Sequence, residues 1–338
     1  MALAQMPLDQ DLDVILDWFE FYVLVSEFKS VPISDIARFW DLRRNSEEST
    51  FDEKEDESAD DDGDQMFAQD LTACIRTRME FLGSSYPFSF STSGESIVFN
   101  PEPSIGKIIY LFCLLISRHG ASEIFDLAKF QFDLSNRVRD LFQACSTWAA
   151  ASLVQGSAIA FGFPRPDHSN FIDALRRVYG LFGEGVVHTT PPRGLSSNPK
   201  DEGIDVIAWG HRADRAAGVP YVLGQVATGK NWRGKTVTSF VGPFHQNWFS
   251  SQPASQFTTA MFIPHCINCS TGATLTEQLM VETRTYGSVF YRYVLPRMAE
   301  AGVAHASEKP AVTVERISDF DEIKTWVSNT ISDMASSL

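Results

Sequence analysis

The sequence predicts an α/β protein in which a mixed central sheet is flanked by helices, with a mostly helical lobe in front of it. The chain has 338 residues, of which 44% are apolar and 21% charged. This is the composition of a soluble globular chain long enough for two domains. Helical spacing dominates the first part, whereas short apolar runs alternate with helical patterns from about residue 155. That alternation is typical of α/β folds, so we expect a helical lobe over residues 1–152 and an α/β domain over 153–338.

The first half predicts mainly helices, because its apolar residues recur at helical spacing. We expect these helices at residues 9–27, 31–43, 66–82, 104–118 and 121–152. Residues 86–100 alternate around a Ser-Gly turn, which predicts a hairpin. Residues 45–65 are dominated by Asp and Glu, whose charges repel at this density, so we expect a disordered acidic loop. An acidic arm that mimics nucleic acid is the alternative for this segment.

The second half predicts strands and helices in alternation. Apolar runs indicate strands at residues 158–163, 204–209, 221–227, 260–267 and 312–316. Helical patterns cover residues 168–182, part of 236–249, 275–301 with a break at Pro296, and 318–336. The aromatic stretch 286–293 falls inside the third of these patterns and is expected to pack in the core.

Charge and cysteine content narrow the class of protein further. The net charge is −15, and the five cysteines are scattered and odd in number, which does not indicate a disulfide framework. The longest strongly apolar stretch, residues 108–116, is too short to cross a bilayer. The first residues lack the features of a secretory signal. We expect a soluble, cytoplasmic protein with no membrane partner.

The most informative stretch for chemistry is residues 201–235. Asp205 lies within an apolar strand, where a carboxylate is costly unless it is paired or binds a cation. Gln225 lies in the next predicted strand and is followed by Lys230 and Lys235. Adjacent strands would bring Asp205 and Gln225 to one edge, where their oxygens suit Mg²⁺ or Mn²⁺. A lysine beside them could stabilise a developing negative charge.

These residues resemble the PD-(D/E)xK nuclease superfamily, whose fold is called restriction-endonuclease-like. Residues 203–205 (Gly-Ile-Asp) are similar to the "GxD" element of its Mrr-like subgroup, and Gln225 to the start of "QxK". The lysine of that pattern is replaced by Ala227. The resemblance covers roughly residues 160–300. It implies a metal-dependent nuclease in which Asp205 and Gln225 bind the metal and Lys230, or else Lys235, acts as the catalytic lysine.

A nucleic-acid partner agrees with the local charge. Residues 165–235 contain ten Lys and Arg against seven Asp and Glu. Basic and aromatic side chains of this region are candidates for phosphate contact and base stacking; in this group we place Arg212, Arg215, Arg233, Lys235 and Trp232. Trp232 and Trp248 are equally candidates for packing. A third acidic metal ligand is not evident, although Asp173, Glu184 and Asp201 are candidates.

The resulting expectation is a Mg²⁺- or Mn²⁺-dependent endonuclease that cleaves nucleic acid, with DNA favoured over RNA. Proteins that resemble it, with a helical lobe in front, often belong to bacterial anti-phage defence systems. The alternative is a catalytically decayed adaptor that binds nucleic acid, a helicase or ATPase, or another defence subunit, and Ala227 favours it. The sequence leaves open whether the chain forms a homo-oligomer.

Overall fold

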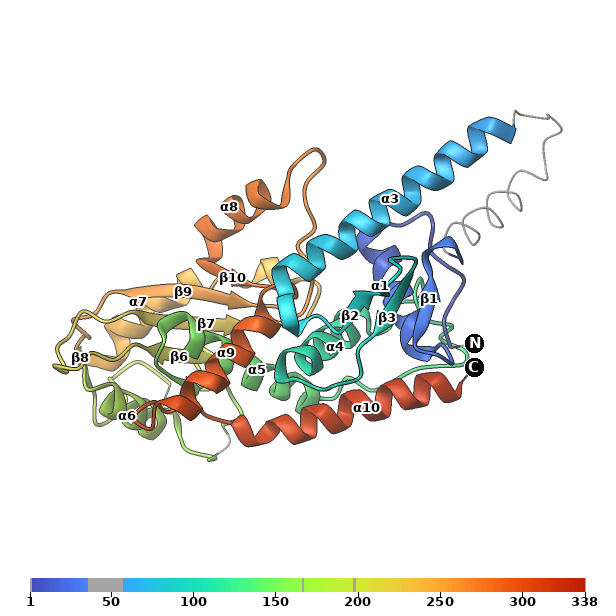
Figure 1. The fold of residues 1–338 in the computed structure, drawn as a ribbon. Helices are drawn as coiled ribbons and strands as arrows, with labels where there is room; N and C mark the ends of the chain where they lie inside the picture. The colour runs from blue at the N-terminus through green and yellow to red at the C-terminus, as the bar shows by residue number, and fades with distance from the viewer. Residues whose placement is uncertain (1, 36–56, 166, 197–198, 338) are drawn as a thin grey trace. The chain divides into compact units, whose positions relative to one another are not determined.

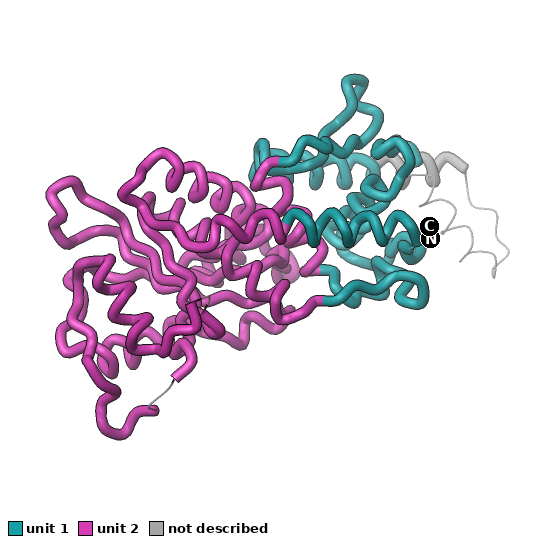
Figure 2. Tube along the Cα trace, turned by 90° about the horizontal axis from the view of Figure 1, so that it is seen from below, with its two compact units in different colours: residues 1–103, 118–133, 324–338 teal, residues 104–117, 134–323 magenta. Residues whose placement is uncertain are grey.

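The computed structural model describes residues 2–35, 57–165, 167–196 and 199–337, which form two compact units (Figure 2). Unit 1 contains residues 1–103, 118–133 and 324–338, and unit 2 contains residues 104–117 and 134–323. This division differs from the predicted boundary between residues 152 and 153. The reason is that the helix covering residues 136–154 is part of unit 2. In the described part of the chain, no helix is both long and apolar enough to span a membrane.

Unit 1 combines helices with a small antiparallel sheet of order β1-β3-β2 (Figure 1). Its elements are α1 (Leu12–Val25), β1 (Ser30–Pro32), α3 (Glu57–Leu82), the short 3₁₀ helix η1 (Gly83–Ser85), β2 (Phe88–Phe90), β3 (Ser96–Phe99) and most of α10 (Phe320–Ser336). The predicted hairpin at 86–100 is confirmed, as are the helices at 9–27, 66–82 and 318–336.

Two predictions for this unit are corrected. Residues 30–32 form a strand that pairs with β3, so the helix predicted at 31–43 does not begin where we expected it. α3 begins at Glu57, inside the segment predicted to be a disordered acidic loop at 45–65. Acidic composition does not exclude a helix there, because the helix dipole favours Asp and Glu near the N-terminus. The parts of both predictions over residues 36–56 lie outside the described residues.

A buried group of charges, the Arg78 cluster, joins α3 to α1 within unit 1. The Arg78 guanidinium is 1% exposed and lies 2.8 Å from the carboxylate of Asp17 and 2.7 Å from that of Glu20. Asp17 also accepts a bond from Arg118 at 2.6 Å, and the Tyr86 hydroxyl donates to Glu20 at 2.6 Å. These buried carboxylates are therefore neutralised by two guanidinium groups from the same unit.

Unit 2 is built on a five-stranded mixed sheet of order β10-β9-β7-β6-β4. The pairs β4–β6 and β6–β7 are antiparallel, and β7–β9 and β9–β10 are parallel. The strands are β4 (Ser157–Ala160), β6 (Val206–Trp209), β7 (Tyr221–Val226), β9 (Phe257–Phe262) and β10 (Ser288–Phe290), with a separate pair, β5 (Val186–Val187) and β8 (Phe249–Ser251). The helices are α4 (Ile105–Arg118), α5 (Asn136–Val154), α6 (Phe171–Phe182), α7 (Val237–Trp248), α8 (Leu275–Tyr286) and α9 (Leu295–Glu308), with 3₁₀ turns η2 (Trp232–Gly234) and η3 (Ile317–Asp319). The predicted class, α/β with a mixed sheet flanked by helices, is confirmed.

Helices cover both faces of this sheet. Because side chains alternate along a strand, Ile207 and Trp209 of β6 and Tyr221 and Leu223 of β7 point to one face. There they join an apolar core with residues of α6 and α7. α5 packs against β4, β6 and β7 but contributes nothing to that core, so it covers the opposite face. The ends of β6 and β7 therefore lie between α5 on one side and α7 on the other.

α5 is itself held by α9. At Gly302 of α9, a Cβ atom would lie 1.9 Å from the backbone oxygen of Trp148 in α5. Only glycine permits this approach, because any side chain would overlap the backbone of α5. The Trp148 indole in turn donates to the backbone oxygen of Glu315 at 3.0 Å. Contacts with α9 and with the backbone of Glu315 thus hold α5 in place.

Three predicted elements of the second half differ from the structure. The pattern at 275–301 is not one long helix, because Gly287, with φ of 76°, ends α8, and residues 288–290 then pair with β9. Residues 286–293 are therefore not helical as a whole. Residues 312–316 form only an isolated bridge, between Val314 and Ala158. The helix predicted at 121–152 begins at Asn136, after a stretch of turns.

Candidate functional site

The structure brings Asp205 and Gln225 together at one edge of the sheet. Asp205 directly precedes β6, and its N–H donates to the backbone oxygen of Gly224 at 2.8 Å. One oxygen of its carboxylate accepts the N–H of Val226 at 2.8 Å. The pairing of Val206 with Gly224 sets Asp205 opposite Gln225. The expectation that adjacent strands bring these two side chains to one edge is therefore met.

Gln225 has an unusual amide. The residue is 7% exposed, yet its Oε1 is buried and has no hydrogen-bond partner. A buried acceptor without a partner costs about 1–3 kcal/mol, and such atoms are rare in folded proteins. An acceptor in this condition is available to a cation or to a ligand that donates a hydrogen bond.

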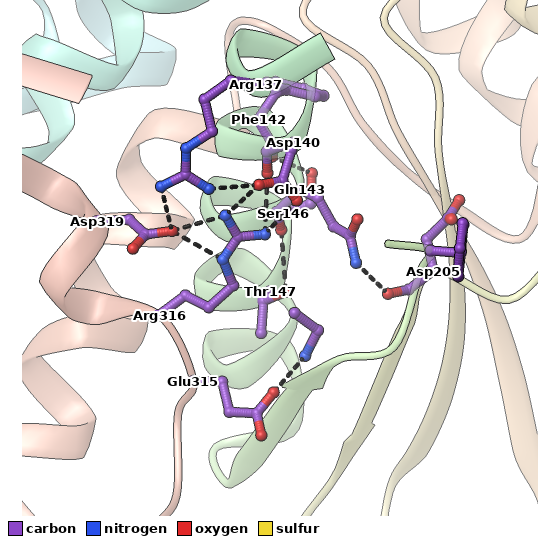
Figure 3. A network of polar contacts seen from close by, with 12 residues as sticks. Arg137, Asp140, Phe142, Gln143, Ser146, Thr147, Asp205, Glu315, Arg316 and Asp319 are labelled. Carbon is purple, nitrogen blue, oxygen red and sulfur yellow. Dashed lines mark hydrogen bonds and ion pairs between the residues drawn. The ribbon is translucent and has the colours of Figure 1, made fainter. Parts of the chain in front are cut away.

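The backbone of Asp205 is held by three donors at a single oxygen. Its carbonyl accepts the N–H of Phe161 at 2.8 Å, the N–H of Gly162 at 3.0 Å and the side-chain amide of Gln143 at 3.0 Å. Gln143 belongs to α5 and is 8% exposed. Its side chain therefore connects the helix on one face of the sheet to the residue that carries the carboxylate (Figure 3).

An ion-pair network fixes α5 one turn before Gln143. The guanidinium of Arg316 contacts the carboxylate of Asp140 at 2.7 Å and that of Asp319 at 2.6 Å (Figure 3). Arg137 also contacts Asp140. Because Arg316 is only 6% exposed, water screens these contacts little, and they hold the start of α5 in place.

Gly162 lets two polar side chains pack against the backbone next to Asp205. A Cβ atom at this position would lie 2.7 Å from Oδ1 of Asp205 and 2.8 Å from both polar atoms of the Gln143 amide. The absence of a side chain thus lets the Asp205 carboxylate and the Gln143 amide approach the Gly162 backbone closely. This glycine has an ordinary φ, so the space around it, not its conformational freedom, is what a side chain would change.

Electrostatics set Asp205 apart from other carboxylates of unit 2. Burial of the carboxylate, followed by the negative charge of Asp201, raises the pKa of Asp205 to about 7. The Val226 N–H and the positive charge of Lys235 act in the opposite direction. A carboxylate with a pKa near neutrality, next to a second acid, is a feature that functional sites often share. Asp201 accepts the N–H of Gly203 at 2.9 Å and that of Phe163 at 3.3 Å.

The two candidate lysines lie in different surroundings. Both are exposed. The positive charge of Lys235 lowers the pKa of Asp205, whereas that of Lys230 lowers the pKa of His265. Burial, together with the positive charges of Arg292 and Lys230, lowers the pKa of His265 to about 4. Its ring contacts the backbone oxygen of Thr228. Ala227, which stands where the nuclease pattern described above has its lysine, is 1% exposed, so a buried methyl group fills this position.

The predicted nucleic-acid-binding residues are not gathered at this edge. Arg212 and Arg215 are exposed in the turn that joins the far ends of β6 and β7. Arg233 contacts Glu282 at 2.7 Å and lies over the ring of Trp232. Trp232 is 2% exposed and packs against Tyr286, which agrees with the packing alternative for this residue. Of this group, Lys235 is the residue whose positive charge lowers the pKa of Asp205.

The other acids proposed as a third ligand lie elsewhere. Glu184 accepts bonds from the backbone and hydroxyl of Ser255, just before β9, and Asp173 contacts Asn170 at the start of α6. In the part of the chain that the structure describes, no group of three or more His, Cys, Asp and Glu side chains is arranged to hold a metal ion. The nearby oxygen donors are instead two carboxylates and one amide, from Asp205, Asp201 and Gln225.

This donor set still suits a hard divalent cation. Mg²⁺ is commonly held by one or two carboxylates while it keeps several waters. The unpartnered oxygen of Gln225 provides an acceptor on the strand beside Asp205. Sequence reasoning missed Gln143 and Gly162. A neutral amide within a long helix and a glycine after a strand carry no charge pattern that would single them out.

Comparisons with protein-family profiles, with curated proteins and with solved structures find no match to this chain.

Proposed function

We propose that unit 2 is a metal-dependent nuclease whose site lies where β6 begins and β7 ends. The observation that carries the proposal is the pairing of Asp205, with its raised pKa, and the buried Gln225 oxygen that lacks a partner. Both states cost stability, which favours a functional role for the pair over a purely structural one.

The topology supports the resemblance to a restriction-endonuclease-like core. α5, β4, β6, β7, α7 and β9 occur in this order along the chain, with α6 and β5 between β4 and β6 and with β8 between α7 and β9. β7 lies between the antiparallel β6 and the parallel β9. Asp205 and Gln225 lie on neighbouring strands, as the resemblance requires.

The chain's own residues have distinct roles in this proposal. Asp205 and Gln225 hold Mg²⁺ or Mn²⁺ through their side-chain oxygens, and Asp201 adds negative charge nearby. When bound, the ion lowers the pKa of a coordinated water and offsets the charge of the phosphate. Lys235, whose charge acts on Asp205, stabilises the negative charge that develops on the phosphodiester. Gln143 keeps the Asp205 backbone in position.

The test is cleavage of plasmid and single-stranded DNA in Mg²⁺ or Mn²⁺. We expect Asp205→Asn to reduce the rate by on the order of 100-fold or more, and Lys235→Ala by a similar factor. The matched controls are Asp214→Asn, in the exposed β6–β7 turn, and Lys230→Ala, beside His265. Both controls should cleave at nearly the wild-type rate. Metal-dependent cleavage that survives Asp205→Asn would refute the proposal.

A second function is favoured by one observation. Ala227 occupies the position of the family lysine and is buried, which is the feature expected of a catalytically decayed adaptor. Such an adaptor would bind nucleic acid or a helicase or ATPase partner in a defence system. In a phage-protection assay the adaptor should tolerate Asp205→Asn and Lys235→Ala, whereas the nuclease should lose protection with either change.

A further inference from the structure

Two exposed phenylalanines border the candidate site. Phe163 is 54% exposed and Phe240 is 40% exposed, although most large apolar side chains of unit 2 are buried. They come from different elements, the connection after β4 and helix α7. Single exposed apolar residues are common on protein surfaces and need no explanation. These two, however, both belong to residues that contact the segment 201–203, just before Asp205.

Phe163 is tied to the site through its backbone. It follows Gly162, the residue that borders the Asp205 carboxylate, and its N–H donates to Asp201 at 3.3 Å. The ammonium group of Lys200 lies 5.8 Å from the centre of the Phe163 ring. An exposed ring with a cation beside it can accept a nucleic-acid base on its face while the cation contacts the adjoining phosphate.

Phe240, on α7, contacts the backbone of Gly203, which lies in the segment 201–203 that also contains Asp201. A Cβ atom on Gly203 would lie 2.6–2.8 Å from three atoms of the Phe240 ring. The ring therefore rests on the backbone of Gly203, two residues before Asp205. Gly203 also has a φ of 78°, which glycine adopts without strain. Lys235, which is exposed, precedes α7, and its positive charge lowers the pKa of Asp205.

We propose that Phe163 and Phe240 stack on unpaired bases next to the reacting phosphate, so that the site takes a single nucleic-acid strand. Bases inside a continuous duplex are already stacked on their neighbours, and exposing them requires unstacking and unpairing. Stacking on aromatic rings tolerates any base sequence, whereas Lys200 and Lys235 contact phosphates. This inference rests on the proposed nuclease function, for which it names the substrate class.

The experiment measures binding without metal, so that it does not depend on cleavage. Fluorescein-labelled 20-nucleotide oligo-dT, oligo-rU and a duplex of equal length are titrated with the full chain in EDTA, and fluorescence anisotropy is recorded. We expect Phe163→Leu and Phe240→Leu each to weaken binding of the single strands by roughly 10-fold while leaving duplex binding unchanged. Phe163→Trp should restore single-strand binding. The oligo-dT and oligo-rU arms distinguish DNA from RNA.

The control variant is Phe257→Leu. Phe257 is 42% exposed but pairs with Tyr221, at the opposite end of β7 from Gln225. Wild-type affinity in both site variants, or an equal loss for single strand and duplex, would overturn the inference. If single-strand binding depends on the two rings but no metal-dependent cleavage occurs, the proposed nuclease activity fails while the strand-binding inference stands.

Discussion

Carboxylates are buried in both units, but their surroundings differ. In the Arg78 cluster of unit 1, Asp17 and Glu20 contact guanidinium groups and a tyrosine hydroxyl. In unit 2, burial raises the pKa of Asp205, and the oxygen of the adjacent Gln225 has no partner. Paired buried charges hold elements together, whereas groups left in unfavourable states are typical of ligand and catalytic sites.

The largest change in stability is expected when the Arg78 cluster of unit 1 loses its central cation. Arg78→Met removes the cation between Asp17 and Glu20, so that Glu20 keeps only the Tyr86 hydroxyl and Asp17 only Arg118 among the contacts described above. We expect the free energy of unfolding to fall by about 3–5 kcal/mol in urea titrations. The matched control is Arg76→Met, two residues earlier on α3, where the side chain is exposed and lies over the Phe90 ring. A loss below about 1 kcal/mol in Arg78→Met would show that the cluster does not stabilise unit 1.

Replacing Asp205 is expected to change the free energy of unfolding in the opposite direction and to stabilise the protein. Its pKa of about 7 exceeds the value of 3.8 expected in the unfolded chain, so the folded state keeps a proton that the unfolded state releases. Wild-type stability therefore falls as pH rises from about 4 to about 7. Because the residue as a whole is half-buried although its carboxylate is shielded from water, we expect Asp205→Asn to stabilise the protein by about 1–3 kcal/mol at pH 8 without metal.

At pH 4 this difference should disappear, because the wild-type carboxyl is then largely protonated. The measurement is urea unfolding of both proteins at the two pH values, with Asp214→Asn as the exposed control. Equal stability of Asp205→Asn and wild type at pH 8 would mean that the charged carboxylate does not destabilise the folded state. The contrast with the Arg78 cluster would then not hold.

The smallest effect compares the two glutamines of the site. Gln143 donates to the Asp205 carbonyl, whereas Oε1 of Gln225 has no partner. We expect Gln143→Leu to lower stability by about 1 kcal/mol and Gln225→Leu to leave it unchanged or raise it slightly. Thermal unfolding in EDTA measures both. A loss in Gln225→Leu as large as that in Gln143→Leu would show that the Gln225 amide has a structural role.

Sequence reasoning located the strands that carry Asp205 and Gln225 because their apolar runs are short and bounded by turns. It failed at residues 275–301, where the aromatic spacing matches a helix but sheet pairing with β9, remote in sequence, takes residues 288–290. Its choice of Lys230 over Lys235 as the catalytic lysine stays a prediction. Distance along the chain cannot show that the 3₁₀ turn at 232–234 comes between them and that only Lys235 acts on Asp205.

The chain crosses between the two units four times, after residues 103, 117, 133 and 323. No single cut can therefore release unit 2 as one continuous polypeptide. A fragment that begins at residue 153 would lack α5, and with it Gln143 and the covering of one sheet face. Such a fragment would expose apolar strand residues and should aggregate when expressed. Assays of this protein therefore call for the full chain with point substitutions, and an inactive fragment would carry no information about the site.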